Sequence, residues 1–252
     1  MMSPLHGATQ RALTDDVQPA PMIGILGGMG PFATLHFYRQ FLQETPTQRD
    51  SDHVRVVIDM HMQLPSRTRA VRFGEESPVE GMVDAIRRLA RYGANFVLVP
   101  CNSAHYFHDQ VSKRVAIPWL NMIDATQAAL ERLNVRRPLL LGGYVTVSQR
   151  LYGDSAVYLA DQANELVYGM IEEIKRRDRL SPESLRQLHS ILDEAERTVG
   201  FDAILLACTE LSAAAHELKS RGVPIVDSNR MYARAALERL GIRPATNLSD
   251  DF

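Results

Sequence analysis

The sequence predicts an α/β protein made of two pseudo-symmetric parallel-sheet lobes with an active site in the cleft between them. Short apolar runs alternate with helical patterns along the chain, which is typical of a parallel sheet. Paired glycines end an apolar run at Gly27-Gly28 and again, 115 residues later, at Gly142-Gly143. Each half also carries one cysteine in a matching setting, Cys101 and Cys208, and each cysteine stands eight residues after a glycine.

Length and composition narrow the class of protein. A chain of 252 residues can form one large domain or two lobes. The net charge of −2, with Lys and Arg scattered along the chain, indicates no nucleic-acid partner. No apolar run reaches the roughly 18 residues of a membrane span and the start lacks a secretory signal, so we expect no membrane association and a cytoplasmic location. In that compartment the two cysteines are expected to be free thiols.

The N-terminal part begins with polar residues and then forms the first strand–helix unit. Residues 1–20 show no apolar periodicity and are expected to be a flexible N-terminal extension. Residues 22–28 predict a strand that enters a glycine turn, and Pro31 suits the first turn of the following helix. The helix face expected to be buried carries Leu35, Tyr38, Phe41 and Leu42.

The later elements follow from the same two patterns, apolar runs between turn residues and helical periodicity ended by glycine. Further strands are predicted at 54–60, 95–99, 116–120, 138–143, in the run before Cys208, and at 223–227. Helices are predicted at 78–92, 103–114, 123–133, over 158–198 with a helix start at Ser181-Pro182-Glu183, between Cys208 and Lys219, and at 231–240. Within 158–198 the expected buried face carries Leu166, Met170, Ile171 and Ile174. Residues 61–67 are expected to form a loop that offers polar groups.

The order of these landmarks repeats, which predicts the division into lobes. The glycine pairs, the cysteines and the Ile-Pro and Val-Pro strands recur in the same order at shifts of 115, 107 and 106 residues. We expect a first lobe of residues 21–121 plus 230–252 and a second lobe of residues 122–229. Because ligands bind beyond the carboxyl ends of parallel strands, both cysteines are expected at a shared cleft.

Two thiols on opposite sides of one carbon atom have a specific chemical use. A cysteine that opens a helix is favoured as thiolate, and a free thiol with a pKa of about 8.5 needs only a modest shift to act as a base. One thiolate can remove the α-proton of an amino acid while the other thiol returns a proton from the far side, which inverts the centre. Asn102, Ser103 and Thr209 follow the cysteines directly and are expected to stabilise the developing enediolate.

Three segments carry a resemblance to a known family. Residues 24–31, 100–105 and 207–211 resemble the cofactor-independent aspartate/glutamate racemase family, and most closely its aspartate racemase branch. The resemblance extends from about residue 22 to residue 240. It implies an amino-acid racemase, an isomerase that works without pyridoxal phosphate or any other cofactor and uses Cys101 and Cys208 as its acid–base pair. It also implies a homodimer and a small acidic amino acid as substrate.

The resemblance also assigns the residues that bind the substrate. Residues 64–68 look like the family's proline-containing arginine loop, and Lys175 is similar to its cleft lysine, so Arg67 and Lys175 are expected to hold the side-chain carboxylate. The full expected set is Met29, Gln63, Arg67, Asn102, Ser103, Thr146, Lys175, Thr209 and Glu210, with no metal ligand. Ser66 stands where the family usually has an acid, and Gly143-Tyr144 stands near its Gly-Thr pair. These departures leave open whether the substrate is aspartate, glutamate or another acid.

Other interpretations of the same residues remain open at this point. Both cysteines could be inert core residues, or ligands of a metal together with His105 and His108, although the close paired spacing of zinc sites is absent. Residues 28–33 fit the loose dinucleotide pattern G-x-G-x-x-A, with Asp59 as a ribose-binding acid. That interpretation leaves both cysteines unused. His105, one helical turn after Cys101, is interpreted as a residue that helps to place the loop.

Alternatives within the same superfamily are a decarboxylase and a maleate-type cis–trans isomerase, in which one cysteine protonates or attacks and the other assists. A binding protein that kept the cleft but lost turnover is a further possibility.

Overall fold

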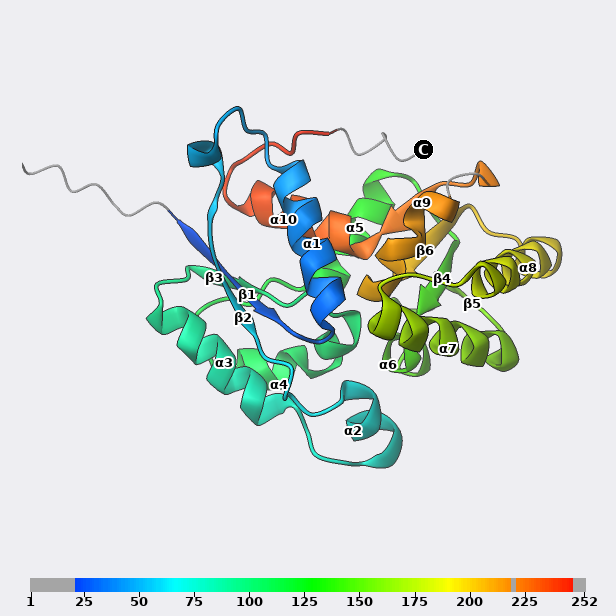
Figure 1. Cartoon of the computed structure of the whole chain (residues 1–252), viewed down its shortest axis with the longest axis horizontal. Coiled ribbons are helices and arrows are strands. Elements are labelled where there is room, and N and C mark those ends of the chain that lie inside the picture. The colour runs from blue at the N-terminus through cyan, green and yellow to red at the C-terminus, as the bar shows by residue number, and fades with distance from the viewer. Residues whose placement is uncertain (1–20, 219–220, 247–252) are drawn as a thin grey trace, which may run out of the picture.

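Two parallel sheets with flanking helices form the molecule (Figure 1). The computed structural model describes residues 21–218 and 221–246, so the expected flexible extension at residues 1–20 lies outside the described part. The first sheet has the order β2-β1-β3, with β1 at Met22–Gly27, β2 at Arg55–Met60 and β3 at Phe96–Leu98. The second has the order β5-β4-β6-β7, with β4 at Pro138–Gly142, β5 at Val157–Tyr158, β6 at Ala203–Ala207 and β7 at Ile225–Asp227. The predicted fold class is confirmed.

Helices connect the strands and cover the sheets. The α-helices are α1 (Pro31–Glu44), α2 (Arg67–Phe73), α3 (Val79–Arg91), α4 (His108–Ser112), α5 (Met122–Arg132), α6 (Tyr144–Ser148), α7 (Asp161–Arg177), α8 (Pro182–Thr198), α9 (Ala215–Leu218) and α10 (Ser228–Arg239). They are accompanied by the 3₁₀ helices η1 (Asp50–Asp52), η2 (Asn102–Phe107) and η3 (Thr209–Ala214). Two of these, η2 and η3, follow the cysteines directly.

The two sheets repeat one plan. In each, a strand that ends in glycine, β1 or β4, pairs in parallel with a strand, β3 or β6, that is followed within three residues by a cysteine. Both cysteines are in extended conformation and begin a 3₁₀ turn. The carbonyl of Cys101 accepts the N–H of Ala104 at 3.1 Å, and the carbonyl of Cys208 accepts that of Leu211 at 2.9 Å. The repetition seen in the sequence therefore extends to the conformation of the two cysteine loops.

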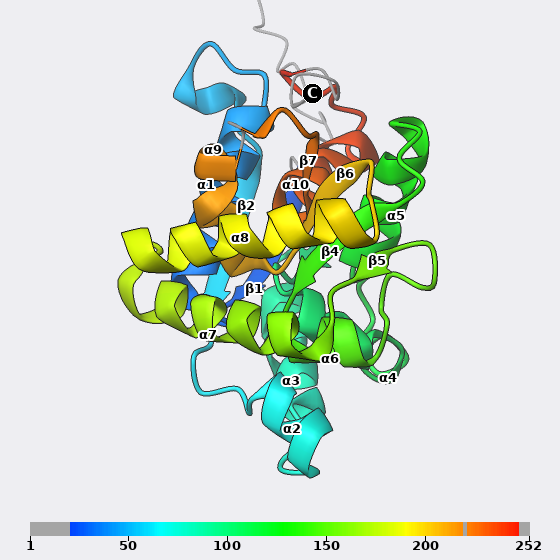
Figure 2. The same cartoon turned by 90° about the vertical axis from the view of Figure 1, so that its right-hand side faces the viewer.

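The central strands are apolar along their whole length because helices cover both faces of each sheet. In the first sheet, Leu26 packs with α3, whereas Ile23 and Ile25 pack with α1 and α10. In the second sheet, Leu141 packs in the cluster formed with α7 and α8, and Leu140 packs in the cluster on the α5 side. Figure 2 shows α7 and α8 lying side by side across the outer face of the second sheet.

The buried faces of two helices differ from the sequence expectation. Leu35 on α1 is 58% exposed, and Leu166 on α7 is 38% exposed, although both were expected to be buried. In α1 the buried residues include Phe37 and Phe41, because this helix packs on α10, with the ring of Phe37 centred 5.7 Å from that of Tyr232. The predicted buried face of α1 was therefore wrong at Leu35, whereas Phe41 is buried as expected.

Two local elements also differ from the prediction. The strand expected at 116–120 is reduced to a single bridge between Trp119 and Val97. Helix α2 was not expected, because its sequence has three arginines and no clear apolar face. By contrast, the helix start expected at Ser181-Pro182-Glu183 is confirmed, because α7 ends at Asp178 in left-handed conformation, φ 60°, and α8 begins at Pro182 with Ser181 as its N-cap.

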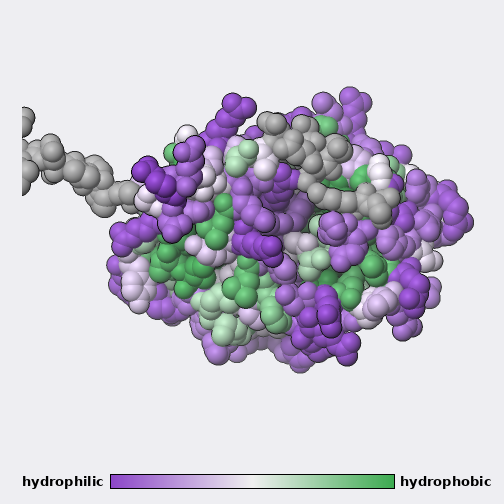
Figure 3. Space-filling model, turned by 45° about the horizontal axis from the view of Figure 1, so that its top comes forward, coloured by the Kyte–Doolittle hydropathy of each residue, from purple (hydrophilic) through white to green (hydrophobic). Residues whose placement is uncertain are grey.

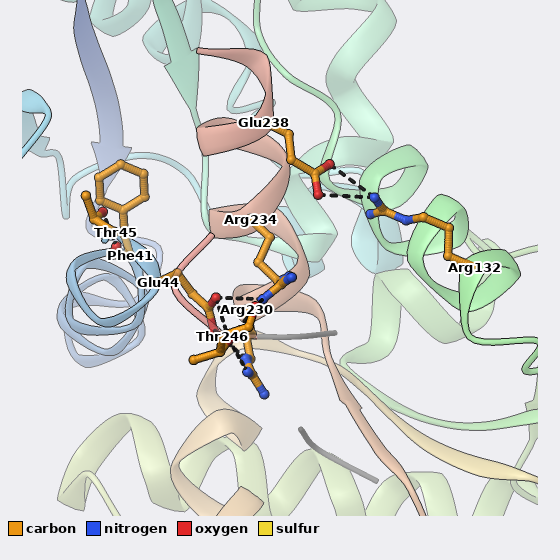
Figure 4. A network of polar contacts seen from close by, with 8 residues as sticks. All are labelled: Phe41, Glu44, Thr45, Arg132, Arg230, Arg234, Glu238 and Thr246. Carbon is orange, nitrogen blue, oxygen red and sulfur yellow. Dashed lines mark hydrogen bonds and ion pairs between the residues drawn. The ribbon is translucent and has the colours of Figure 1, made fainter. Parts of the chain in front are cut away.

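Helix α10 joins the two sheets. It begins at the end of β7 in the second sheet, and Tyr232 in its middle lies in the core of the first sheet. Buried Glu44, at the end of α1, pairs with Arg230 at 2.5 Å and with Arg234 at 2.7 Å, and it accepts a hydrogen bond from Thr246 (Figure 4). Because a buried carboxylate needs such partners, this network fixes α1 and the chain after α10 against α10.

The view of the surface in Figure 3 shows mostly hydrophilic side chains with separate hydrophobic patches between them. Across residues 21–218 and 221–246, no helix combines the length and the apolar character that crossing a bilayer requires.

Candidate active site

One pocket receives residues from both halves of the chain. Its volume is about 210 Å³, and both cysteine side chains line it. Of the residues expected to form the site, the lining includes Met29, Arg67, Cys101, Asn102, Ser103, Lys175, Cys208, Thr209 and Glu210. Gln63 is exposed outside the pocket, and Thr146 is buried in α6 without lining it. The two cysteines, distant in sequence, therefore face one small cavity.

Cys101 and Cys208 reach the pocket because each follows the carboxyl end of a buried parallel strand, β3 at the edge of the first sheet and β6 inside the second. The Cys101 residue is 7% exposed, and both cysteines are free thiols. The glycine after β4 leaves room between the loops: a Cβ on Gly143 would lie 3.7 Å from Oγ of Ser103 and 4.0 Å from Sγ of Cys208. A larger residue at Gly143 would narrow the space between the two cysteine loops.

A carboxylate and an ammonium group surround Cys208. Its thiol donates a hydrogen bond to Oε2 of Glu210 at 3.1 Å. Burial and the charge of Glu210 raise the pKa of Cys208 well above its ordinary value, although the nearby Lys175 acts in the opposite direction. The expectation that the helix start makes this thiol a better acid is thus wrong for Cys208, because the element that follows is only a 3₁₀ helix of six residues, and burial, followed by the charge of Glu210, raises the pKa.

The carboxylates of Glu172 and Glu210 act on the ammonium group of Lys175. Its Nζ lies 2.6 Å from Oε1 of Glu172. Burial lowers the pKa of Lys175, but Glu210, Glu172 and Cys208 together raise it above its ordinary value. The lysine is therefore charged at neutral pH and partly compensates the negative charge of Glu210.

Arg67 differs from Lys175 in its partners. It is the first residue of α2, and its guanidinium donates to the carbonyl oxygens of Pro65 at 3.0 Å and Met29 at 3.4 Å. Within the described ranges, no carboxylate lies within ion-pair distance of this guanidinium. Two backbone carbonyls orient the charge but leave it without a negative partner, which suits the binding of a carboxylate.

The side chains behind Cys101 hold its loop. Nδ1–H of His105 donates to the carbonyl of Cys101 at 2.9 Å, as the sequence interpretation of a loop-placing residue predicted. Burial lowers the pKa of His105 to about 3, so the ring is neutral at pH 7. The amide of Asn102 is bound within the protein, since its nitrogen donates to Ser228 and its oxygen accepts from Tyr152.

The sequence did not indicate the outer wall of the pocket. Arg72 lies over the ring of Tyr144, with 4.8 Å between its Cζ and the ring centroid, and within 3.7 Å of Glu165. Tyr168 packs edge-on against Tyr144 at 6.0 Å. These four residues line the pocket together with Glu172. A signal was available, because Glu165, Tyr168, Glu172 and Lys175 recur at helical spacing on α7.

The structure also bears on the dinucleotide interpretation. Asp59 is bound by the guanidinium of Arg88 at 2.9 Å. A Cβ on Gly28 would lie 2.8 Å from the backbone of His61, so this glycine allows close packing against the end of β2. The pocket of about 210 Å³ is also smaller than the roughly 300–1,000 Å³ of drug-sized ligand sites. These features do not favour a dinucleotide.

Among the described residues, no group of three or more His, Cys, Asp or Glu side chains is placed to hold a metal ion.

Comparison with known proteins identifies relatives over most of the chain. The model of the Asp/Glu/hydantoin racemase family matches residues 26–236. The broad specificity amino-acid racemase RacX of Bacillus subtilis (strain 168) is 25% identical over 230 residues, which are 86% of this chain and 96% of that protein.

Solved structures agree with this match. The Picrophilus torridus aspartate racemase is 30% identical with a TM-score of 0.80, and the match covers 89% of this chain and 96% of that one. An aspartate racemase homologue from Pyrococcus horikoshii OT3 shares the fold at 23% identity with a TM-score of 0.69, covering 87% of this chain and 99% of that one. The resemblance found in the sequence is confirmed. The chain is a member of the Asp/Glu/hydantoin racemase family, and hence an isomerase.

Proposed function

We propose that this racemase inverts the α-carbon of an aspartate-like acidic amino acid by proton transfer between Cys101 and Cys208, without pyridoxal phosphate. The observation that carries the proposal is that both thiols line one pocket, although they follow strands of different sheets. An α-carbon bound between them would present its proton to one thiol and its opposite face to the other.

The environment of Cys208 sets the starting protonation states in this proposal. Because the pKa of Cys208 is raised, this residue holds its proton at neutral pH and can donate it. Cys101 as thiolate then removes the α-proton from the other face. At the end of the step Cys101 carries the proton and Cys208 is the thiolate, so the enzyme is ready for the opposite enantiomer and no net proton is consumed.

The substrate is assigned from the charges of the pocket. Arg67 and Lys175 would hold the side-chain carboxylate, and Ser103, Thr209 and the backbone amides beside them would stabilise the enediolate. The name of the Picrophilus torridus relative, aspartate racemase, supports an acidic substrate, whereas that of RacX indicates that a related chain accepts many amino acids. Met29 would form part of the cleft wall.

The proposal also covers the boundary between the lobes, the oligomeric state and the location of the enzyme. We place the boundary between the lobes so that residues 21–121 and 230–252 form the first and residues 122–229 the second. The family resemblance supports a homodimer. We also propose a cytoplasmic location, which the two free thiols support because that compartment keeps thiols reduced.

Exchange of the α-proton tests the proposal directly. Each enantiomer of aspartate, glutamate and a panel of neutral and basic amino acids would be incubated with the protein in deuterated buffer. We expect deuterium at the α-carbon and chiral inversion, fastest for an acidic substrate. Carbon dioxide release or isomerisation of maleate without α-exchange would instead indicate one of the alternative chemistries, and tight binding without exchange would indicate a binding protein.

Replacing Glu210 with glutamine should shift the pH dependence of the reaction. Loss of the negative charge beside Cys208 lowers the pKa of this thiol towards its ordinary value. In the direction in which Cys208 removes the proton, the rising limb of the kcat/KM profile should move to lower pH by about 1 to 3 units. In the other direction, Cys208 must start as a thiol, so the falling limb should move to lower pH as well.

A matched control is Glu172→Gln, because Glu172 is also a carboxylate of the pocket wall but binds Lys175 and not Cys208. The rising and falling limbs of its kcat/KM profile should stay at the same pH. Equal shifts in the two variants would mean that the general charge of the pocket, and not the contact between Glu210 and Cys208, controls the thiol.

A further inference from the structure

The two cysteine loops meet behind the pocket at the first residues of α10. This helix begins at Ser228, directly after β7, and both Ser228 and Asn229 are completely buried. Neither residue lines the pocket. Their polar side chains are therefore placed to act on the protein and not on a ligand.

Ser228 holds the loop of Cys101. Its Oγ accepts a hydrogen bond from Nδ2 of Asn102 at 3.0 Å, and Oδ1 of Asn102 accepts one from the hydroxyl of Tyr152 at 2.6 Å. Both ends of this amide, in the residue after Cys101, are thus fixed. One turn further along α10, the hydroxyl of Tyr232 accepts the N–H of Val99 at 3.1 Å, which holds the chain before Cys101 as well.

Asn229 holds the loop of Cys208. Its Nδ2 lies 3.3 Å from the carbonyl oxygen of Thr209 and 3.0 Å from Oγ of Ser212, and it donates to both. Ser212 in turn donates to Oδ1 of Asp227 at 2.8 Å. The residue after the second cysteine is therefore bound to α10 as the residue after the first one is.

Asp227 anchors this helix start. Its carboxylate caps the helix by accepting the N–H of Asn229 at 2.9 Å, and its other oxygen accepts from Nε2 of Gln40 on α1 at 2.7 Å. A buried carboxylate with these partners resists displacement. The helix start is consequently fixed to both sheets.

We propose that Ser228 and Asn229 are positioning residues that set the separation of the two catalytic thiols, Ser228 through Asn102 and Asn229 through Thr209. This inference depends on the proposed two-cysteine reaction. Because the Cα atoms of consecutive residues lie about 3.8 Å apart, two neighbouring residues of one helix transmit a fixed spacing to both loops. Proton transfer to and from one carbon requires such precision, since a misplacement of about 1 Å can cost about 100-fold in rate.

The test compares Ser228→Ala and Asn229→Ala with Thr45→Ala as a matched control. Thr45 is also buried and its hydroxyl donates to the carbonyl of Phe41 at 2.7 Å, but it lies at the far end of α1 (Figure 4). We expect kcat to fall about 10- to 100-fold in the first two variants while KM stays within about twofold, because the groups that bind the substrate are unchanged. Thr45→Ala should keep its kcat.

A second readout separates positioning from general destabilisation. With substrate deuterated at the α-carbon, Ser228→Ala should raise the primary isotope effect in the direction in which Cys101 removes the proton. Asn229→Ala should raise it in the opposite direction. Tyr152→Phe, which removes the other hydrogen bond to Asn102 but keeps the ring, should follow Ser228→Ala, and it provides the same test if the alanine variants do not fold.

Each outcome is informative. Variants that resemble Thr45→Ala, or isotope effects that rise equally in both directions, would overturn the positioning role. Racemisation that persists in Cys101→Ser or Cys208→Ser would instead overturn the two-cysteine reaction itself, so the two failures are distinguishable.

Discussion

Cys101→Ser and Cys208→Ser should each lose racemisation while keeping the fold. A serine hydroxyl holds its proton far more tightly than a thiol, whose pKa is about 8.5, so it is a poor base near neutral pH. Because positioned acid–base groups contribute about 10²- to 10⁴-fold, we expect kcat to fall by at least that range in both directions. Chiral chromatography of each enantiomer incubated with each variant measures the loss.

The two variants should differ in the exchange that remains. The cysteine that is left can still remove a proton from its own side of the α-carbon, so each variant should exchange deuterium slowly into one enantiomer, and the two variants into opposite ones. The chain has two cysteines in total, so one titratable thiol and an unchanged unfolding temperature confirm each variant. Full racemisation by either variant would contradict the assignment of that cysteine.

The sequence predicted these two residues because their settings are local. A buried parallel strand has the pattern of an apolar run, and a cysteine follows β6 directly and β3 after Val99 and Pro100. The order of the glycine, cysteine and proline landmarks then predicted two similar sheets. None of these inferences depends on contacts between distant residues.

The errors arose where tertiary contacts decide the outcome. Leu35 and Leu166 fit an apolar helix face, but the structure leaves both exposed. Helix α2 has no apolar periodicity to reveal it, and its start is marked only by Ser66, whose side chain accepts the N–H of Arg69. The expected strand at 116–120 pairs with β3 through one residue only.

In the candidate site, too, the sequence did not predict contacts between residues far apart in the chain. Residues next to the cysteines could be predicted from their position, but the outer wall joins Arg72 of α2 to Tyr144 and Glu165, which follow in later elements. The helical spacing of polar residues on α7 was a local signal for one side of this wall, but the contacts of that side with Arg72 and Tyr144 have no local signature. The side chain of Asn102 is another example, because its position after Cys101 indicated a role towards the substrate, whereas its amide is bound by Tyr152 and Ser228.

Arg67→Met should remove the preference for an acidic substrate. The guanidinium of Arg67 is oriented by two carbonyl oxygens and has no carboxylate partner among the described residues, so a substrate carboxylate would be its first negative partner. A hydrogen bond to a charged group contributes about 1.5–3 kcal/mol, which corresponds to about a 10- to 150-fold loss of kcat/KM for aspartate. Neutral amino acids should be much less affected, since they have no carboxylate for this residue to bind.

Two further variants test whether the loss of kcat/KM for aspartate is caused by Arg67 itself. Arg67→Lys keeps the charge but loses the paired N–H geometry, so its kcat/KM for aspartate should lie between those of the parent and Arg67→Met. Arg72→Met removes another guanidinium of the pocket wall, but this one is already paired with Glu165 and stacked on Tyr144. It should therefore keep the ratio of acidic to neutral substrates. If Arg72→Met changes that ratio as much as Arg67→Met does, the carboxylate is bound by the general positive charge of the pocket wall and not by Arg67.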